Sequence, residues 1–525
     1  MSKLNFNIRL DSIFVIMDIW TVLWSILVFI TVYIYYQSGK VKFFEKHGIP
    51  HIKPWPLLGN VGALLFRRIS MFHYMQNVYN LNKDAKYVGF YDFGSPTVVI
   101  RDPELIKSIA IKNFDHFVNH RSFVNPEVEP LFGNNLFSLH DDRWREIRNL
   151  LTPAFTSSKM KGMFKLMSNC AENFVDYLVK DSKEKPLEIF SKDAFCRYTN
   201  DVIATCAFGI SINSMKDKTN DFYVLGRKAT NFEGLMSVKF FFVRSFPNFS
   251  RLFNIRIIDS RADGFFKKIV EDTVRTRDEK GITRPDMIQL MMETRANKTG
   301  PTLSIGDMTS QAFIFFFGGF DTTSSLMSFV VHEVAANPEI QTKLQTEIDE
   351  MFERTNGDVT YEAVNRLAYL DAVINETLRY YPIAGFLDRV CSKSFELPPT
   401  LPGAKPHRLE PGDFLWFPVF AIQRDPVYFD EPEKFYPDRF IEDPKGTLNS
   451  PAYMPFGLGP RMCIGNRFAL LETKVLLVHL VSKCQLKPGK KMNVPLELSK
   501  SILAMTAKGG FYLEIQPRKS QEKNS

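Results

Sequence analysis

The chain has 525 residues, of which 45% are hydrophobic and 24% are charged, an ordinary globular balance. The formal net charge of +8 suits anionic lipid or an acidic partner. No nucleic-acid-binding motif or concentrated basic arm occurs, so we expect no nucleic-acid partner. Six cysteines stand at irregular spacing without a C-x-x-C pair, which argues against zinc knuckles and thioredoxin-type chemistry and indicates a reducing compartment.

The amino-terminal segment predicts a membrane anchor. Residues 13–36 are apolar apart from Asp18, are long enough to cross a bilayer, and carry Trp and Tyr near both ends. A cleaved signal peptide would have a shorter apolar core and a small-residue cleavage site, and neither is found. A buried core helix is the alternative. We expect a short lumenal tail over 1–12 and a transmembrane signal-anchor over 13–36.

Lys40, Lys42 and Lys46 follow this segment, so the positive-inside rule places the large carboxy-terminal part in the cytosol. Prolines at 50, 54 and 56 discourage helix, and residues 37–60 are predicted as a proline-rich linker. The remainder, 61–525, is predicted as one cytosolic domain, since no repeat or second linker divides it.

The body is predicted to be mainly α with small β-sheets. Residues 86–101 alternate like a strand pair, interrupted by a Gly-Ser-Pro turn, and 387–418 form a second strand-rich region. Lys239 to Phe253 (KFFFVRSFPNFSRLF) pairs aromatic with basic residues. This segment is either an interior element or one that dips into a membrane interface.

One long helix is strongly indicated. Ser304 and Asp307 form an S-x-x-D capping box, and Asn337-Pro338 marks the end. The helix is apolar nearly all round, so it should run through the interior. Inside it lies the segment Gly318-Gly319-Phe320-Asp321-Thr322-Thr323, in which each glycine costs about 1 kcal/mol relative to alanine. Close helix packing, with the hydroxyls bonded to the preceding turn, is one explanation. A helix opened locally for a ligand or water is the other.

Cys463 stands in a glycine-rich loop, PFGLGPRMCIGNRFA, just before a helical segment. A helix start favours a thiolate, and loop N–H groups can donate to the sulfur of a metal ligand. Glycines 457, 459 and 465 are expected to free the backbone here. A buried structural cysteine is the alternative.

The same loop carries a resemblance to a known family. Phe456, Gly459, Arg461, Cys463 and Gly465 match the F-x-x-G-x-R-x-C-x-G haem-binding loop of the cytochrome P450 superfamily. Further landmarks occur in the expected order and are as follows: Trp144 and Arg148 match W-x-x-x-R, GGFDTT at 318–323 matches the oxygen-activating segment, Glu376 and Arg379 match E-x-x-R, and Arg439 lies in PDRF, which resembles P-E-R-F. Gln423 stands where the family often has His, so we assign it no role.

The resemblance implies a cytochrome P450 fold with haem b (iron protoporphyrin IX) as cofactor. Cys463 would be the axial iron ligand that favours O–O cleavage, and Asp321 with Thr322 would relay protons. Gly318 and Gly319 would leave room for dioxygen. The implied propionate contacts are Trp144, Arg148, Arg389 and Arg461, and Glu376, Arg379 and Arg439 would stabilise the fold.

The segments at 315–325 and 332–349 look like the insect microsomal branch associated with xenobiotic detoxification. This implies a monooxygenase of the endoplasmic reticulum membrane that takes electrons from NADPH–cytochrome P450 reductase, with cytochrome b5 as a second donor. Substrates would be small and lipophilic, such as plant toxins or insecticides. The residues expected by analogy to line the pocket are Phe114, Phe117, Phe315, Ile383, Leu387 and Met505. Alternatives are an endogenous lipid, hormone or fatty-acid hydroxylase, a reductase-independent isomerase, and a non-catalytic haem sensor.

Overall fold

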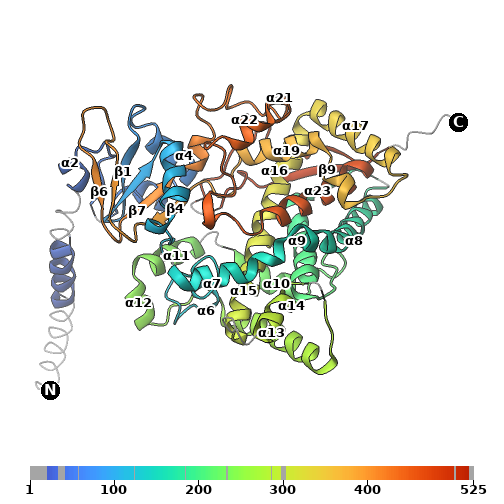
Figure 1. The fold of residues 1–525 in the computed structure, drawn as a ribbon, viewed down its shortest axis with the longest axis horizontal. Coiled ribbons are helices and arrows are strands. Elements are labelled where there is room, and N and C mark those ends of the chain that lie inside the picture. Colours follow the sequence, from blue (N-terminus) through green and yellow to red (C-terminus); the bar gives the residue numbers. More distant parts are fainter. Residues whose placement is uncertain are drawn as a thin grey trace, which may run out of the picture.

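The computed structural model describes residues 20–33 and 42–518, except 57, 123, 184, 232–234, 285, 297–302 and 502–503. Figure 1 shows a helix-rich part beside a smaller part built on a sheet, with the amino-terminal helix standing off the latter. The predicted fold class, mainly α with small β-sheets, is confirmed.

The described strands form three small sheets, in the orders β1-β2-β7-β4, β3-β9-β8 and β5-β6. Their bounds are β1 Tyr87–Asp92, β2 Ser95–Ile100, β3 Leu187–Phe190, β4 Leu387–Val390, β5 Phe395–Leu397, β6 His407–Leu409, β7 Phe414–Phe417, β8 Cys484–Pro488 and β9 Tyr512–Pro517. Both predicted strand regions are present. The first turn differs from the prediction, because Ser95 and Pro96 already pair with β1 and the chain reverses at Phe93 and Gly94.

Most other elements are helices. In the first half they are α2 Phe43–Lys46, α3 Gly62–Leu65, α4 Met71–Tyr79, α5 Pro103–Lys107, η1 Ser108–Lys112, η2 Phe114–His116, α6 Pro130–Gly133, α7 Asp141–Leu151, η3 Thr152–Phe155, α8 Ser157–Asp181, α9 Ser191–Ile203, η4 Ala204–Phe208, α10 Asp221–Thr230, α11 Leu235–Ser245 and α12 Pro247–Leu252. In the second half they are α13 Ser260–Lys280, α14 Met287–Ala296, α15 Ile305–Phe317, η5 Gly318–Thr322, α16 Thr323–Ala336, α17 Pro338–Arg354, α18 Tyr361–Val364, α19 Ala368–Tyr380, α20 Val419–Ile422, α21 Arg439–Glu442, α22 Pro444–Asn449, η6 Gly459–Arg461 and α23 Asn466–Lys483.

The long central helix has the predicted limits. Both hydrogen bonds of the Ser304–Asp307 capping box are present, and the helix ends before Asn337-Pro338. Its middle, η5, is one turn of π-helix between α15 and α16. Among the described residues, this is the helix whose length and composition would allow it to cross a membrane, but most of its apolar stretch is buried inside the fold. It is therefore a core helix.

The amino-terminal segment is described only in part. Residues Trp20–Tyr33 form an apolar helix with exposed side chains, and the rest of the predicted 13–36 span and the 1–12 tail lie outside the described residues. The segment predicted as a linker, 37–60, is packed against the folded body from Phe43 onward. Phe44 is fully buried, and its ring occupies the position that a Cβ on Gly89 would need. The Gly89 N–H donates to the Pro50 carbonyl.

A buried ion cluster connects α19 to the segment that leads to Cys463. Glu376 and Arg379 are both fully buried and 2.7 Å apart, and Arg439 lies 3.2 Å from the same carboxylate. Arg379 also donates to three main-chain carbonyls, so all five of its N–H groups have acceptors. The Gln423 amide donates to α19 carbonyls and accepts from the Met454 N–H. Gln423 therefore connects α19 to the segment before Cys463, a structural role that the sequence did not indicate.

Candidate active site

The Cys463 loop is closed by its own backbone and by a neighbouring helix. The Cys463 N–H donates to the Phe456 carbonyl across 2.9 Å. Gly457 and Gly459 have φ of +80° and +70°, which favours glycine. A Cβ at Gly459 would also clash with the Ala110 carbonyl in η1. Gly465 has neither a positive φ nor a close neighbour, so the expectation that it frees the backbone is wrong.

Cys463 differs from the other five cysteines. All six are free thiols, and Cys463 is the exposed one, whereas the rest are buried or half-buried. Burial still raises the pKa of its thiol, while a backbone N–H of Gly465 and the charge of Arg148 lower it. A thiol that has accessible surface although it is surrounded by protein faces an internal space. That combination fits a ligand-binding thiol better than a packed structural one.

Three arginines and a tryptophan gather beside this thiol. The Arg461 guanidinium lies 4.1 Å from the centre of the Trp144 ring. Burial, followed by repulsion from Arg389, lowers the pKa of Arg461 to about 9, and Arg148 also contributes repulsion. Arg148 in turn interacts with Cys463. The sequence-predicted residues Trp144, Arg148, Arg389 and Arg461 are therefore brought together.

The carboxylates that act on this cluster are those of Asp388 and Asp141, and Asp388 already binds His120 and the Arg121 N–H. Arg389 is almost fully buried, and burial lowers its pKa to about 10. Its Nε has no hydrogen-bond partner among the described residues. Leaving a buried charged donor unpaired is costly. A flat group that brings carboxylates to these arginines and a metal to the thiol would satisfy both, so the residues present fit the expected haem.

The central helix opens where the sequence placed Gly318 and Gly319. A Cβ at Gly318 would meet no atom within 4 Å, whereas one at Gly319 would clash with Ile203. The two explanations of this segment thus each hold for one glycine: Gly318 borders open space, and Gly319 is needed for close helix packing. Thr322, at the end of η5, is exposed within an otherwise buried helix, and its hydroxyl donates to the Gly318 carbonyl.

Helix α9 supports this opening through residues that sequence reasoning missed. The Lys192 ammonium lies 2.9 Å from the Asp321 carboxylate and also donates to the Asp321 carbonyl and to the Ser324 and Ser325 hydroxyls. The Thr199 hydroxyl donates to the Phe320 carbonyl across 2.9 Å. The same two carbonyls also accept from the Ser324 and Ser325 hydroxyls of the next turn, so α9 adds donors to a turn in which the regular α-helical pattern is interrupted. No local pattern around Lys192 pointed to a helix more than 120 residues away.

The residues expected to line a substrate pocket fall into separate groups among the described contacts. Ile383 and Met505 pack in the same apolar cluster. Leu387 lies 3.6 Å from the Cβ position of Gly457, beside the Cys463 loop. Residues 502–503, shortly before Met505, lie outside the described residues.

The three phenylalanines expected in the pocket have different neighbours. Phe315 packs on Phe155, with ring centres 5.6 Å apart. The Phe114 ring lies 5.6 Å from Trp144, at the cation cluster. Phe117 is fully buried, 5.2 Å from Phe395, in the core beneath the sheet. Phe114 therefore lies beside the candidate site and Phe117 lies in the core, and their expected place in a substrate pocket stays a prediction.

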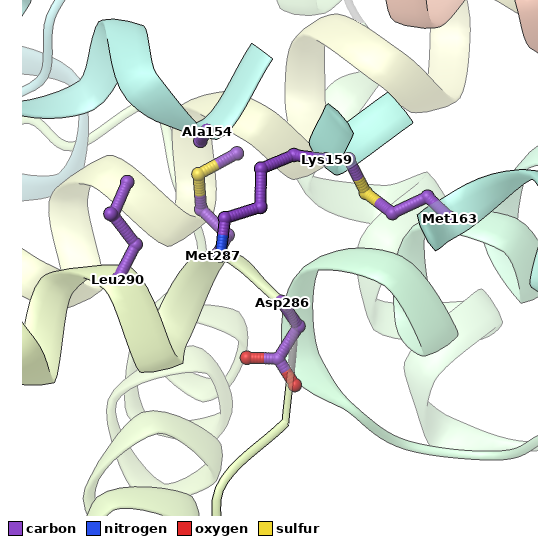
Figure 2. A pocket seen from close by; sticks show the side chains of 6 residues that line it. All are labelled: Ala154, Lys159, Met163, Asp286, Met287 and Leu290. Carbon is purple, nitrogen blue, oxygen red and sulfur yellow. The ribbon is translucent and has the colours of Figure 1, made fainter. Parts of the chain in front are cut away.

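A small cavity elsewhere has different chemistry. It lies between α8 and α14 and is lined by Ala154, Lys159, Met163, Asp286, Met287 and Leu290, which Figure 2 shows. Asp286 is already bound by both terminal nitrogens of the Arg277 guanidinium. None of the sequence-predicted site residues contributes to this cavity, so it does not compete with the Cys463 region.

Comparison with known proteins agrees with this geometry. The family profile described as "Cytochrome P450" matches residues 49–514. Cytochrome P450 9e2 of Blattella germanica is 42% identical over 95% of this chain and 98% of its own length. Probable cytochrome P450 9f2 of Drosophila melanogaster is 39% identical over 92% and 96%, and cytochrome P450 6j1 of Blattella germanica is 35% identical over 93% and 97%. The chain therefore belongs to the cytochrome P450 family, and it is a haem-dependent monooxygenase of the kind found in insects.

Proposed function

We propose that Cys463 binds the haem iron and that Arg148, Arg389, Arg461 and Trp144 hold the haem carboxylates. The single observation that carries this proposal is the exposed Cys463 thiol beside a buried arginine cluster in which the Arg389 Nε has no hydrogen-bond partner within the part of the chain that the structure describes. Bound haem supplies the iron at which dioxygen is reduced and one oxygen atom is passed to substrate. Phe456, Gly459 and Gly465 shape the loop around the thiol.

Asp321 and Thr322 are proposed to hold and move the protons that this reaction consumes. Both lie on the opened turn, and Gly318 leaves space beside them. The Lys192 side chain, 19% exposed, connects the Asp321 carboxylate toward solvent. A proton can pass from the Asp321 carboxyl to the Thr322 hydroxyl once that hydroxyl leaves the Gly318 carbonyl.

Electrons are proposed to come from NADPH–cytochrome P450 reductase, with cytochrome b5 as a second donor. Arg467, four residues after Cys463, offers exposed positive charge beside the site, whereas Arg145 on α7 is already ion-paired with Asp115. An exposed positive charge suits an acidic donor.

The proposed substrates are small lipophilic xenobiotics such as plant toxins or insecticides. The half-buried apolar side chains of Ile383, Leu387 and Phe456 favour this class, because apolar lining selects apolar ligands. An endogenous lipid, hormone or fatty acid would fit the same lining and is the second candidate class.

The proposed reaction predicts the origin of the product oxygen. With labelled dioxygen, NADPH and reductase, the product of a lipophilic substrate should contain one labelled atom, measured by mass spectrometry. Omitting the reductase or NADPH should abolish product. Label arriving only from water, or turnover without a reductase, would favour the isomerase alternative and contradict the proposal.

The proposed proton relay predicts a loss of product without an equal loss of NADPH consumption. Thr322→Val and Asp321→Asn should each lower product formation by about 100-fold, with the missing electrons recovered as hydrogen peroxide or water. Thr323→Val is the matched control, because the Thr323 side chain is buried beside the opening. Equal product loss in this control, or none in Thr322→Val, would remove the relay role.

The proposed location is the endoplasmic reticulum membrane, with 1–12 lumenal, 13–36 spanning the bilayer, and the body in the cytosol. The apolar helix Trp20–Tyr33 supports an anchor. A second membrane contact is proposed at the 239–253 segment, because the exposure of its apolar side chains favours the interfacial alternative. Exposed apolar side chains lie on α11 and α12 and at the two ends of α12, namely Phe242, Phe246, Phe249, Leu252 and Phe253. Amphipathic aromatic helices bind bilayer surfaces.

This second contact predicts lipid binding that survives loss of the anchor. A chain without residues 1–41 should co-float with phosphatidylcholine vesicles. Phe246→Ser with Phe249→Ser should weaken that binding by at least about 10-fold, since each buried Phe contributes about 1.5–3 kcal/mol. Val427→Ser is the control, because Val427 is equally apolar and 77% exposed at another place. Equal weakening by the control would refute a specific α11–α12 contact.

A further inference from the structure

A four-residue segment, Val118 to Arg121, meets every element that carries the arginine cluster. Asn119 accepts a hydrogen bond from the Asp141 N–H across 2.9 Å and donates to the Asp141 carboxylate across 2.8 Å. Asp141 is the first residue of α7, the helix that carries Trp144 and Arg148, and its φ of +47° is strained for a non-glycine residue. The Asn119 side chain therefore holds α7 at its start.

The same segment is bound to β4, which carries Arg389. The Asn119 carbonyl accepts from the Val390 N–H across 2.9 Å. The His120 Nδ1 lies 2.9 Å from the Asp388 carboxylate, and the Arg121 N–H donates to the other oxygen of that carboxylate across 2.7 Å. Asp388 and His120 are both buried. Because the carboxylate only accepts, Nδ1 must be the protonated ring nitrogen.

The segment also reaches the third arginine. The Arg461 Nε donates to the carbonyl of Val118, the residue just before Asn119, across 2.8 Å. Arg148, Arg389 and Arg461 belong to three different elements, and the charges of Arg389 and Arg148 both repel Arg461. Their separation is therefore set from outside the cluster, and residues 118–121 contact all three of the elements concerned.

A second buried carboxylate fixes the segment from its other side. Asp92, at the end of β1, is fully buried and lies 2.5 Å from a terminal nitrogen of Arg121 and 2.5 Å from one of Arg244 in α11. The Arg121 guanidinium also lies 4.2 Å from the centre of the Phe414 ring. Arg121 is thus held away from the cluster. His120 is the residue of this segment whose side chain binds β4, through Asp388.

We propose that Asn119 and His120 are positioning residues for the carboxylates of the haem. They set the spacing of Arg148, Arg389 and Arg461 through α7, Asp388 and Val118, and they do this without being iron ligands. This inference rests on the proposed function of those arginines. It predicts that loss of either residue weakens the binding of haem, which has free carboxylates, and leaves the binding of a haem with blocked carboxylates unchanged.

The test compares two cofactors in the same holoprotein. The full chain is loaded with haem or with haem dimethyl ester, whose carboxylates are blocked, and cofactor transfer to excess apomyoglobin is followed by absorbance. His120→Leu should release haem about 10-fold faster or more but release the dimethyl ester within about twofold of the unmodified chain. His120→Gln, which can still donate to Asp388, should recover much of the retention.

Two further variants separate the outcomes. His116→Leu, four residues earlier at a half-buried site, should leave both release rates unchanged. Asn119→Ala should show the pattern predicted for His120→Leu and replaces it if His120→Leu folds poorly. Equal acceleration of both cofactors would assign a merely structural role and overturn the inference, as would no acceleration in His120→Leu and Asn119→Ala. Arg389→Leu tests the underlying assignment: unchanged haem release there would refute the proposed arginine role itself.

Discussion

The placement of Cys463 depends on a buried ion pair nearly a hundred residues earlier in the chain. Glu376 and Arg379 are on adjacent turns of α19 and have no exposed surface. Burying two charges is costly unless every hydrogen-bonding group is satisfied. Arg379 meets that condition by binding the carbonyls of Gln423, Pro432 and Lys434, so the desolvation cost is offset only when this irregular segment adopts one conformation. Gln423 then holds Met454, at the start of the Cys463 loop.

The central helix of the candidate site is locally irregular. The π turn at Gly318–Thr322 breaks the regular hydrogen bonding of a buried helix, which would leave carbonyls unsatisfied without side-chain donors. The Ser324 and Ser325 hydroxyls of the next turn supply such donors, and Lys192 and Thr199 of α9 add two more from a separate helix. Asp321 and Thr322 on this turn keep exposed surface, so this polar pair is not fully desolvated.

Local patterns predicted the elements well and the long-range contacts poorly. Ser304 with Asp307 predicted the start of the central helix, because capping acts within a few residues. The two glycines left close packing and a local opening as alternatives, and each holds for one of them. The turn after β1 was placed two residues late, since Pro96 is tolerated in β2 just outside its pairing with β7. The partners of Asp388 and Asp321 could not be predicted, because His120 lies 268 residues from the first and Lys192 lies on a separate helix.

The candidate site followed the same division. The family loop predicted Cys463 and Arg461, and the other landmarks of the resemblance predicted Arg148 and Arg389. The structure places Arg148 and Arg389 near Arg461. The six residues expected in the substrate pocket were chosen by analogy alone, and their described contacts place them in several clusters. Substrate-facing positions depend on how loops pack against one another, which carries no periodic signal in the sequence.

The central claim is that the Cys463 thiolate is the iron ligand. The most direct measurement is the absorbance of the reduced carbonyl complex of Cys463→Ser, beside Cys170→Ser, which alters a half-buried cysteine outside the loop. The account predicts that the thiolate-type Soret band is lost in Cys463→Ser and unchanged in Cys170→Ser. A thiolate-type band that persists in Cys463→Ser would contradict it.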